Sequence, residues 1–196
     1  MLSVACERID AILPDGASMD AALARIPDMR RRKALAFRFE ADRRRSVAAW
    51  LLVERLLAAR GVDVARLVVA DRADGKPELD RPRGLHFSLS HADERVMAAV
   101  SDNPVGCDVE KVVPIEDGVV EAAMTPEEVR MLHEFPKGAM QDVAFTRFWV
   151  RRESRFKAGG EGNLSDYDFG DGYLGCVCEA SDTSPTADAS KNSPPR

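Results

Sequence analysis

The chain has 196 residues, of which 45% are hydrophobic and 31% are charged, and its formal net charge is −5. This length and composition are typical of a globular protein that forms one domain or two small lobes. The acidic balance gives no general nucleic-acid signature. No stretch approaches the roughly 18 consecutive apolar residues of a membrane span. We therefore expect neither a nucleic-acid partner nor a membrane partner.

The first ten residues carry charges at positions where a secretion signal needs an apolar run. The four cysteines show no zinc-site spacing, and Cys176-Val177-Cys178 is too isolated in the sequence to form a metal site. Thiols that bind no metal and sit in a chain without a secretion signal are expected to be reduced. These features predict a cytoplasmic protein.

The N-terminal half is predicted to contain a strand, two helices and two further strands. Residues 2–13 alternate weakly as a strand, and residues 17–60 read as two helices. The stronger helix runs from Asp42 to Arg60, with apolar side chains at helical spacing, and Gly61 ends it. A turn at 74–77 is followed by an alternating strand at 86–91 and a short apolar strand at 95–100.

Basic residues are concentrated between positions 30 and 60, which hold ten Lys and Arg residues and only three acidic ones. Such a local excess indicates either an anionic ligand or an acidic protein surface as a partner. A solvated helix face explains many of these arginines equally well. The excess alone does not decide between these interpretations.

The C-terminal half alternates strands and helices. Residues 105–113 form the next predicted strand, and Thr125-Pro126-Glu127-Glu128 has the pattern of a helix capping box. A further helix is predicted from Phe145 to Ala158, ended by Gly159-Gly160, and residues 166–180 hold one or two short strands. From residue 181 onward the sequence lacks an apolar pattern and is predicted to be disordered.

Three carboxylates from these two elements form a candidate metal site. Asp108 and Glu110 lie two residues apart in a predicted strand and therefore share one face. A helix packed beside that strand brings Glu153 to the same place. Three carboxylates repel one another unless a hard cation lies among them, and Mg²⁺ with phosphate oxygens is the usual solution. Lys157 shares a helix face with Glu153, so the pattern favours phosphoryl chemistry.

Each of these residues also has a purely structural interpretation. Asp108 and Glu110 fit an exposed strand face paired with Lys111, and Glu153 with Lys157 fits an ordinary helical ion pair. His91 fits a core histidine with satisfied hydrogen bonds, and Lys76 fits an exposed turn. No single residue settles the function.

Four motifs taken together resemble one known family, the Sfp-type 4′-phosphopantetheinyl transferases. That family shows, in order, a Gly-Lys-Pro turn, a strand ending in Ser-His, a Gly-x-Asp-x-Glu strand, and a helix in which a Lys lies four residues after a Glu. The segments of this chain that match these four motifs, in order, are Gly75-Lys76-Pro77, Phe87-Ser88-Leu89-Ser90-His91, Gly106-Cys107-Asp108-Val109-Glu110 and Trp149-Val150-Arg151-Arg152-Glu153-Ser154-Arg155-Phe156-Lys157. Asp42-Arg43-Arg44-Arg45-Ser46 also resembles the start of the family's basic helix.

The resemblance implies an α/β (α+β) fold of pseudo-dimeric, two-lobed architecture. Each lobe is expected to pair a small antiparallel sheet with a long helix, and coenzyme A is expected to bind between the lobes. The implied division is an N-terminal lobe over 1–102, a C-terminal lobe with the metal site over 103–180 that is short for the family, and a disordered tail over 181–196. Because both lobes lie in one chain, a monomer is expected to suffice.

The resemblance further implies transfer of 4′-phosphopantetheine from coenzyme A to a serine of an acyl or peptidyl carrier protein. Mg²⁺ would be held by Asp108, Glu110 and Glu153. Glu153 would also act as the base toward the carrier serine, and Lys157 would stabilise or protonate the leaving nucleotide. The nucleotide phosphates would be bound by Arg45, Lys76, Ser90 and His91, with Arg152 at a position where the family has lysine.

Two other functions remain compatible with the sequence. One is a degenerate relative that binds coenzyme A or a carrier protein without catalysis, because Arg152 replaces the family lysine and the C-terminal lobe is short. The other is an unrelated metal-dependent phosphohydrolase that uses the same three carboxylates. Nucleotide release from coenzyme A without a carrier would distinguish the phosphohydrolase.

Overall fold

The computed structural model describes residues 1–71, 77–116 and 118–181. It is a mixed α/β structure with small antiparallel sheets, which confirms the predicted fold class at that level. The N-terminal elements are β1 (Ser3–Arg8), α1 (Ile9–Ile12), α2 (Met19–Arg25), α3 (Asp28–Ala36), α4 (Glu40–Ala59), a 3-10 turn (Val64–Arg66), β2 (Val68–Asp71), β3 (Pro77–Arg81), β4 (His86–Ala92) and β5 (Arg95–Ser101). The C-terminal elements are β6 (Val105–Lys111), α5 (Val119–Ala123), α6 (Pro126–His133), α7 (Ala139–Ala158), β7 (Asn163–Asp168) and β8 (Tyr173–Glu179).

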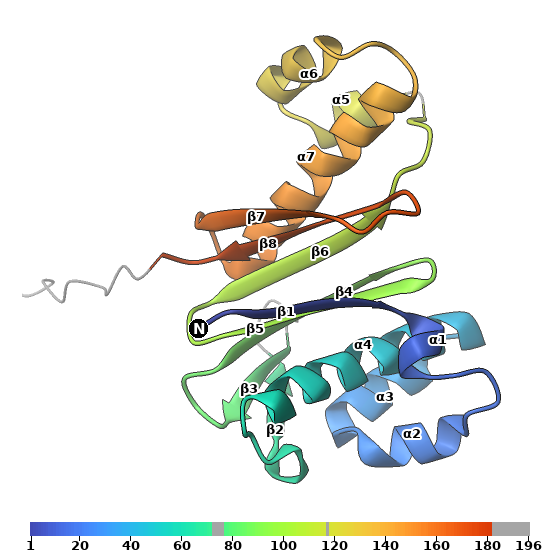
Figure 1. Cartoon of the computed structure of the whole chain (residues 1–196), viewed down its shortest axis with the longest axis vertical. Coiled ribbons are helices and arrows are strands. Elements are labelled where there is room, and N and C mark those ends of the chain that lie inside the picture. The colour runs from blue at the N-terminus through green and yellow to red at the C-terminus, as the bar shows by residue number, and fades with distance from the viewer. Residues whose placement is uncertain (72–76, 117, 182–196) are drawn as a thin grey trace, which may run out of the picture.

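The N-terminal sheet, in the order β1-β5-β4, packs against the long helix α4 (Figure 1). Both strand pairs are antiparallel, and Val100 lies opposite Ser3 on one side and Phe87 on the other. Trp50 of α4 meets Phe87 edge-on, with ring centroids 5.4 Å apart. Because the apolar residues of α4 recur every three or four positions, one helix face enters the core and orients α4 on the sheet.

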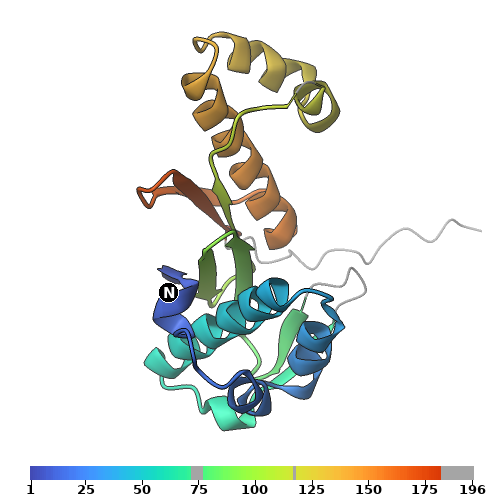
Figure 2. The same ribbon diagram turned by 90° about the vertical axis from the view of Figure 1, so that its right-hand side faces the viewer.

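The C-terminal sheet, in the order β6-β8-β7, packs against α7, the second helix of 20 residues (Figures 1 and 2). It repeats the arrangement of the N-terminal sheet, since in each the first strand is followed by a long helix and the last strand takes the middle position. A second hydrophobic cluster joins the two sheets, with Met97 and Ala99 of β5 against Val105, Cys107 and Val109 of β6.

The helical region of the N-terminal half differs from the prediction. Three helices, α2, α3 and α4, lie where the pattern predicted two. Ile26 and Pro27 adopt extended backbone between α2 and α3, and Phe37 and Phe39 do the same before α4. Proline at such a position disfavours the helical conformation of the residue before it, which separates α2 from α3.

The C-terminal elements follow the prediction more closely. The capping box at Thr125 is present in both of its hydrogen bonds. Two strands, β7 and β8, form where one or two were predicted within 166–180, and β7 begins three residues earlier, at Asn163. Helix α7 begins at Ala139, six residues before the predicted start at Phe145. The predicted turn around Lys76 and the predicted disordered tail fall on 72–76 and 182–196, outside the described residues.

A glycine sets the distance between β6 and α7. The Cα of Gly106 faces α7 so closely that a Cβ there would overlap the carbonyl oxygen of Ser154 and lie 2.5 Å from the amide nitrogen of Ala158. These are backbone atoms and cannot turn away. The absence of a side chain at Gly106 therefore allows β6 to approach α7.

Replacing Gly106 by alanine is expected to force β6 and α7 apart and to lower the free energy of unfolding by about 3 kcal/mol. The matched control is Gly84→Ala, where an added Cβ meets nothing within 4 Å but φ is +80°. The control measures backbone strain alone and is expected to cost about 1 kcal/mol. Urea unfolding followed by circular dichroism checks both. An equal cost at the two positions would contradict close packing at Gly106.

Candidate active site

The site lies where β6 faces α7. Alternate residues of β6 share a face, so Asp108 and Glu110 point to the same side as Gly106, the residue in contact with α7. The Asp108 side chain is buried, whereas Glu110 is half-buried. Glu153 of α7 is also half-buried and directly precedes Ser154, which touches Gly106. The strand and the helix thus present carboxylates to a common region.

Asp108 is held by two groups on one of its oxygens. The ammonium of Lys157 donates to Oδ1 at 2.7 Å, and the hydroxyl of Ser90 donates to the same oxygen at 2.7 Å. Lys157 Nζ also lies 3.3 Å from Ser90 Oγ and 3.2 Å from the carbonyl oxygen of Cys107. Asp108 Oδ2 is buried and has no hydrogen-bond partner among the residues that the structure describes.

The electrostatics link the carboxylates to one another. Burial raises the pKa of Glu110 to about 7, and the negative charges of Asp108 and Glu153 add to this effect while Lys157 opposes it. Burial by itself would lower the pKa of Lys157, but Asp108 and, more weakly, Glu153 outweigh it and raise that pKa. Lys157 therefore stays a cation among acidic groups. Glu110 loses its proton only against its burial and the repulsion from Asp108 and Glu153.

Within the described residues, no three His, Cys, Asp or Glu side chains already surround a point that would hold a metal ion. The chemistry of the donors nevertheless fits a hard cation. Asp108 Oδ2 is a buried acceptor that no donor within the described ranges satisfies, and Glu110 is a carboxyl group whose burial and acidic neighbours oppose its ionisation. Carboxylate oxygens of this kind are the ligands that Mg²⁺ takes.

A basic group lies next to the carboxylates. His91 follows Ser90 on β4 and is half-buried, and its pKa is lowered by burial, by the positive charge of Arg45 and, more weakly, by Lys157. Arg45, near the start of α4, donates from Nε to the carbonyl of Asp93 at 2.9 Å and pairs with Asp42 at 2.6 Å. His91 thus lies within electrostatic reach of Arg45 and Lys157.

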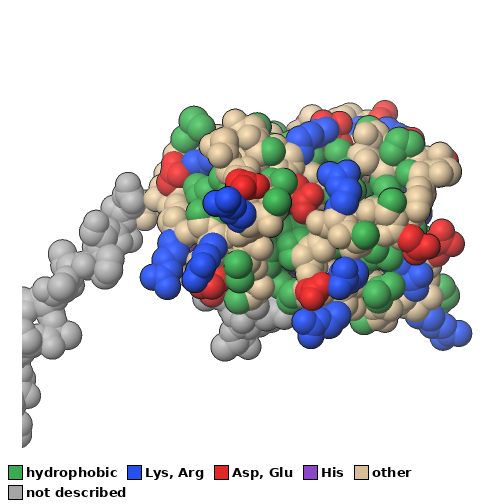
Figure 3. Space-filling model, turned by 90° about the horizontal axis from the view of Figure 1, so that it is seen from below, with side chains coloured by type: hydrophobic (Ala, Val, Ile, Leu, Met, Phe, Trp, Pro, Cys, Tyr) green, Lys and Arg blue, Asp and Glu red, His purple; other side chains and the backbone are tan. Residues whose placement is uncertain are grey.

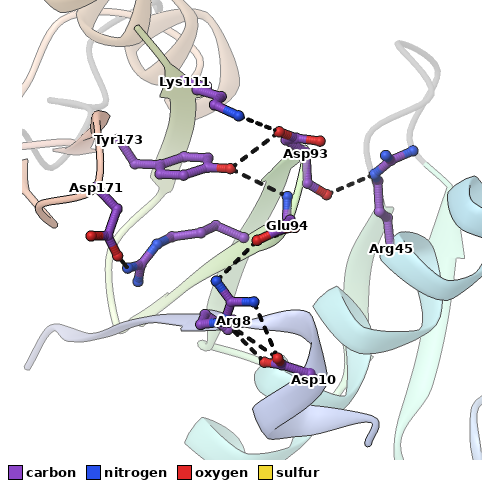
Figure 4. A network of polar contacts seen from close by, with 9 residues as sticks. Arg8, Asp10, Arg45, Asp93, Glu94, Lys111, Asp171 and Tyr173 are labelled. Carbon is purple, nitrogen blue, oxygen red and sulfur yellow. Dashed lines mark hydrogen bonds and ion pairs between the residues drawn. The ribbon is translucent and has the colours of Figure 1, made fainter. Parts of the chain in front are cut away.

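Asp93, in the turn between β4 and β5, joins the two sheets and was missed in the sequence. Lys111 at the end of β6 donates to its carboxylate at 2.7 Å, and the Tyr173 hydroxyl of β8 lies 3.4 Å from it (Figure 4). Arg45 approaches the Asp93 carbonyl from α4 in the same view. No signal in the sequence pointed to these contacts of Asp93, because they depend on how the turn between β4 and β5 lies against the C-terminal sheet.

Two predicted nucleotide-binding residues are not placed with this group. Lys76 lies outside the described residues. The exposed Arg152 donates to the carbonyl of Ala123 at the end of α5. Of the predicted site residues, the structure therefore brings together Ser90, His91, Asp108, Glu110, Lys157 and, by their electrostatic influence, Arg45 and Glu153.

Half of the ten basic residues in segment 30–60 form ion pairs with acidic side chains of the described residues. Several of its arginines pair with acidic side chains, and Lys and Arg lie interspersed with Asp and Glu on the face shown in Figure 3. The described pairs are Arg31 with Asp28, Arg44 with Asp15, Arg45 with Asp42, Arg55 with Glu7, and Arg60 with Asp102. The alternative of a solvated, ion-paired face therefore accounts for these residues.

A groove of about 280 Å³ opens beside Glu110, between the end of β6 and the outer face of α7. Its walls are mostly apolar and combine the chain after β6 with aromatic side chains of α7. The lining residues are Glu110, Lys111, Val113, Pro114, Ile115, Glu116, Val119, Phe145, Thr146 and Trp149. Glu110 therefore lies both at the edge of the candidate site and in the wall of this apolar groove.

The described part of the chain contains no helix that is both long enough and apolar enough to cross a bilayer. Residues 104–192 match the model of the 4′-phosphopantetheinyl transferase superfamily. This match spans β6 and α7, the two elements that carry the carboxylates.

Curated relatives agree with the family match. The chain is 29% identical over 134 residues to 4′-phosphopantetheinyl transferase psf-1 of Bacillus pumilus, covering 68% of this chain and 57% of the relative. It is 27% identical over 144 residues to a 4′-phosphopantetheinyl transferase of Bacillus subtilis, with 73% and 64% covered. It is 31% identical over 117 residues to 4′-phosphopantetheinyl transferase AcpT of Salmonella typhimurium, with 58% and 59% covered.

The chain therefore spans less than two thirds of the length of these relatives. The family model covers less than half of this chain, over the acidic strand and the long helix α7. The similarity to the relatives extends over more than half of it. These matches show that the chain is similar to 4′-phosphopantetheinyl transferases, with the family model lying over its acidic strand and its second long helix.

Proposed function

We propose that this chain transfers the 4′-phosphopantetheine group from coenzyme A to a serine of an acyl or peptidyl carrier protein, in a reaction that depends on Mg²⁺. The observation that carries the proposal is Asp108, a buried carboxylate held on one oxygen and without a hydrogen-bond partner among the described residues on the other, with two further carboxylates and a lysine around it. Such a group suits a pyrophosphate with its metal ion. The relatives' names point to the same reaction.

We propose that the two sheets with their long helices are the two lobes of a pseudo-dimeric fold, divided near residue 102. The repeated strand order and the two 20-residue helices support this division. Coenzyme A would bind between them, where β4 of one lobe lies beside β6 of the other and contributes Ser90 and His91. Because both sides of this cleft come from one chain, we propose a monomer, acting in the cytoplasm.

The proposed reaction breaks the pyrophosphate of coenzyme A. The carrier serine oxygen forms a new bond to the phosphorus that carries pantetheine, and the bond from that phosphorus to the bridging oxygen breaks, which releases adenosine 3′,5′-bisphosphate. When bound, Mg²⁺ would neutralise the phosphate oxygens as charge develops on the leaving group. Asp108, Glu110 and Glu153 would hold it through their carboxylate oxygens.

The chain's own residues would move the protons. Glu153 would accept the proton of the serine hydroxyl at a carboxylate oxygen. Lys157 is kept charged by Asp108 and is therefore suited to stabilise the leaving phosphate or to protonate it at an oxygen. Arg45 and His91 would contact the nucleotide phosphates, with Arg45 released from Asp93 or Asp42 by the competing anion. Roles for Lys76, Ser90 and Arg152 at these phosphates remain predictions.

The apolar groove beside Glu110 fits the partner side of this reaction. It begins at a proposed metal ligand and is walled by side chains such as Trp149 and Val113. The carrier serine reaches Glu153 only if the carrier protein itself docks beside the acidic edge. The apolar wall of the groove can contact the carrier surface there. We propose that the carrier approaches on this side of α7.

The first test incubates the chain with an apo carrier protein, coenzyme A and Mg²⁺ and follows the intact mass of the carrier. We expect a gain of one phosphopantetheine, which disappears when a chelator removes the metal. Asp108→Asn keeps the shape of the side chain but removes its charge, and it is expected to slow transfer by about 100-fold or more. Asp80→Asn, at an exposed position of β3, is the matched control and is expected to retain full activity.

Coenzyme A binding without mass gain on fatty-acid, polyketide and peptide carriers would instead support a non-catalytic relative. Release of a nucleotide from coenzyme A in the absence of any carrier would support a phosphohydrolase. Near-normal turnover by Asp108→Asn would contradict the assignment of Asp108 to the metal.

A second prediction concerns the stability of the metal-free protein. The pKa of Glu110 rises from 4.5 to about 7 on folding, so the folded chain holds this proton more tightly than the unfolded chain does. The associated stability is fully present below the unfolded pKa and is lost as pH rises through the folded pKa. In a metal-free buffer, the free energy of unfolding of the wild-type chain is therefore expected to fall between about pH 5 and pH 8. Glu110→Gln is expected to show a smaller fall over the same range.

Chemical unfolding at a series of pH values measures this difference. Glu78→Gln, at an exposed position of β3, serves as the control and is expected to keep the slope of the wild-type chain. Parallel pH profiles for Glu110→Gln and the wild-type chain would show that the buried acidic cluster does not perturb Glu110.

A further inference from the structure

The two oxygens of the Asp108 carboxylate have opposite surroundings. Oδ1 accepts hydrogen bonds from Lys157 and from Ser90, each at 2.7 Å. Oδ2 is buried and accepts none from the described residues. A buried carboxylate oxygen without a partner is costly, because it has lost its water without gaining a donor. The protein therefore satisfies one oxygen of Asp108 and leaves the other available to an external ligand.

Of the two donors, Ser90 has the shorter and stiffer connection to its backbone. It lies on β4, and 8% of its surface is exposed. Its hydroxyl is fixed by a single rotatable bond, whereas the Lys157 ammonium ends a flexible four-carbon chain. Lys157 is also the group that the proposed reaction sends toward a phosphate. When Lys157 turns to that phosphate, Ser90 remains on Asp108 Oδ1.

We infer that Ser90 is a positioning residue that holds Asp108 Oδ1 and so directs Oδ2 to the metal, rather than only a ligand of the nucleotide phosphates. The inference rests on the proposed function, because it assigns Asp108 to a metal site. It predicts that Asp108 binds through one oxygen. Outer hydrogen bonds of this kind commonly fix the orientation of metal ligands.

The neighbouring Ser88 provides a matched comparison on the same strand. It also faces β6, is 3% exposed, and accepts a hydrogen bond from the amide of Cys107 at 3.0 Å. Ser88 and Ser90 thus both join β4 to β6, one through the backbone and one through Asp108. Removing either hydroxyl disturbs the contact between the strands, but only the loss of Ser90 removes a donor from Asp108 Oδ1 and leaves that oxygen to the flexible side chain of Lys157.

The test titrates the metal alone, as Mn²⁺, and follows the free ion by electron paramagnetic resonance. The chains compared are wild type, Asp108→Ala, Ser90→Ala and Ser88→Ala, with unfolding curves measured for each. Asp108→Ala defines the signal that belongs to this site. Ser90→Ala is expected to weaken Mn²⁺ binding by about 10-fold, the loss typical of a group that orients a ligand. Ser88→Ala is expected to stay within about 2-fold of wild type, because it touches no proposed metal ligand.

Two results would overturn the inference while leaving the proposed function in place. One is unchanged Mn²⁺ affinity in Ser90→Ala beside a clear loss in Asp108→Ala. The other is an equal loss in Ser88→Ala and Ser90→Ala, which would mean that the affinity depends on the general contact between β4 and β6. If the wild-type chain binds no more Mn²⁺ than Asp108→Ala, the proposed metal site fails as well, and the inference fails with it.

Discussion

The buried ion pair between Asp108 and Lys157 connects the parts of this molecule that the proposed chemistry needs. It joins β6 to the last turn of α7 at 2.7 Å, and through the Ser90 hydroxyl it also reaches β4 in the other sheet. Breaking a buried pair by removing one partner leaves an uncompensated charge, which is strongly destabilising. The pair depends in turn on Gly106, since a side chain there would hold the strand away from the helix.

The same pair leaves an electrostatic imbalance that a cation relieves. Lys157 is one positive charge among three carboxylates, and the pKa of Glu110, near 7, reflects the remaining repulsion together with burial. Asp108 Oδ2 is an acceptor without a donor in the part of the chain that the structure describes. A fold that only needed stability would gain from an apolar side chain at such a position. Retaining acids there is physically reasonable where they bind a metal and a phosphate.

The strand faces and the capping box were predictable because they depend on local spacing. Asp108 and Glu110 share a face by the period of a strand, and Thr125 with Glu128 forms a cap from four consecutive residues. The break between α2 and α3 and the early start of α7 were missed, because buried apolar residues such as Ile26 and Ala144 continue on both sides of the true helix ends. The contact of Ser90 with Asp108 and the role of Asp93 were also beyond the sequence, since both depend on how β4 lies against the C-terminal sheet.

The most direct measurement of the central claim is the anomalous diffraction of Mn²⁺ in crystals of this chain grown with coenzyme A. We expect one metal peak at about 2.1 Å from Asp108 Oδ2, with oxygens of Glu110, Glu153 and the pyrophosphate completing the ligands. Lys157 would then lie against a phosphate oxygen. Coenzyme A seated in the cleft with no metal at Asp108, or with Lys157 still filling the position beside the carboxylates, would contradict it.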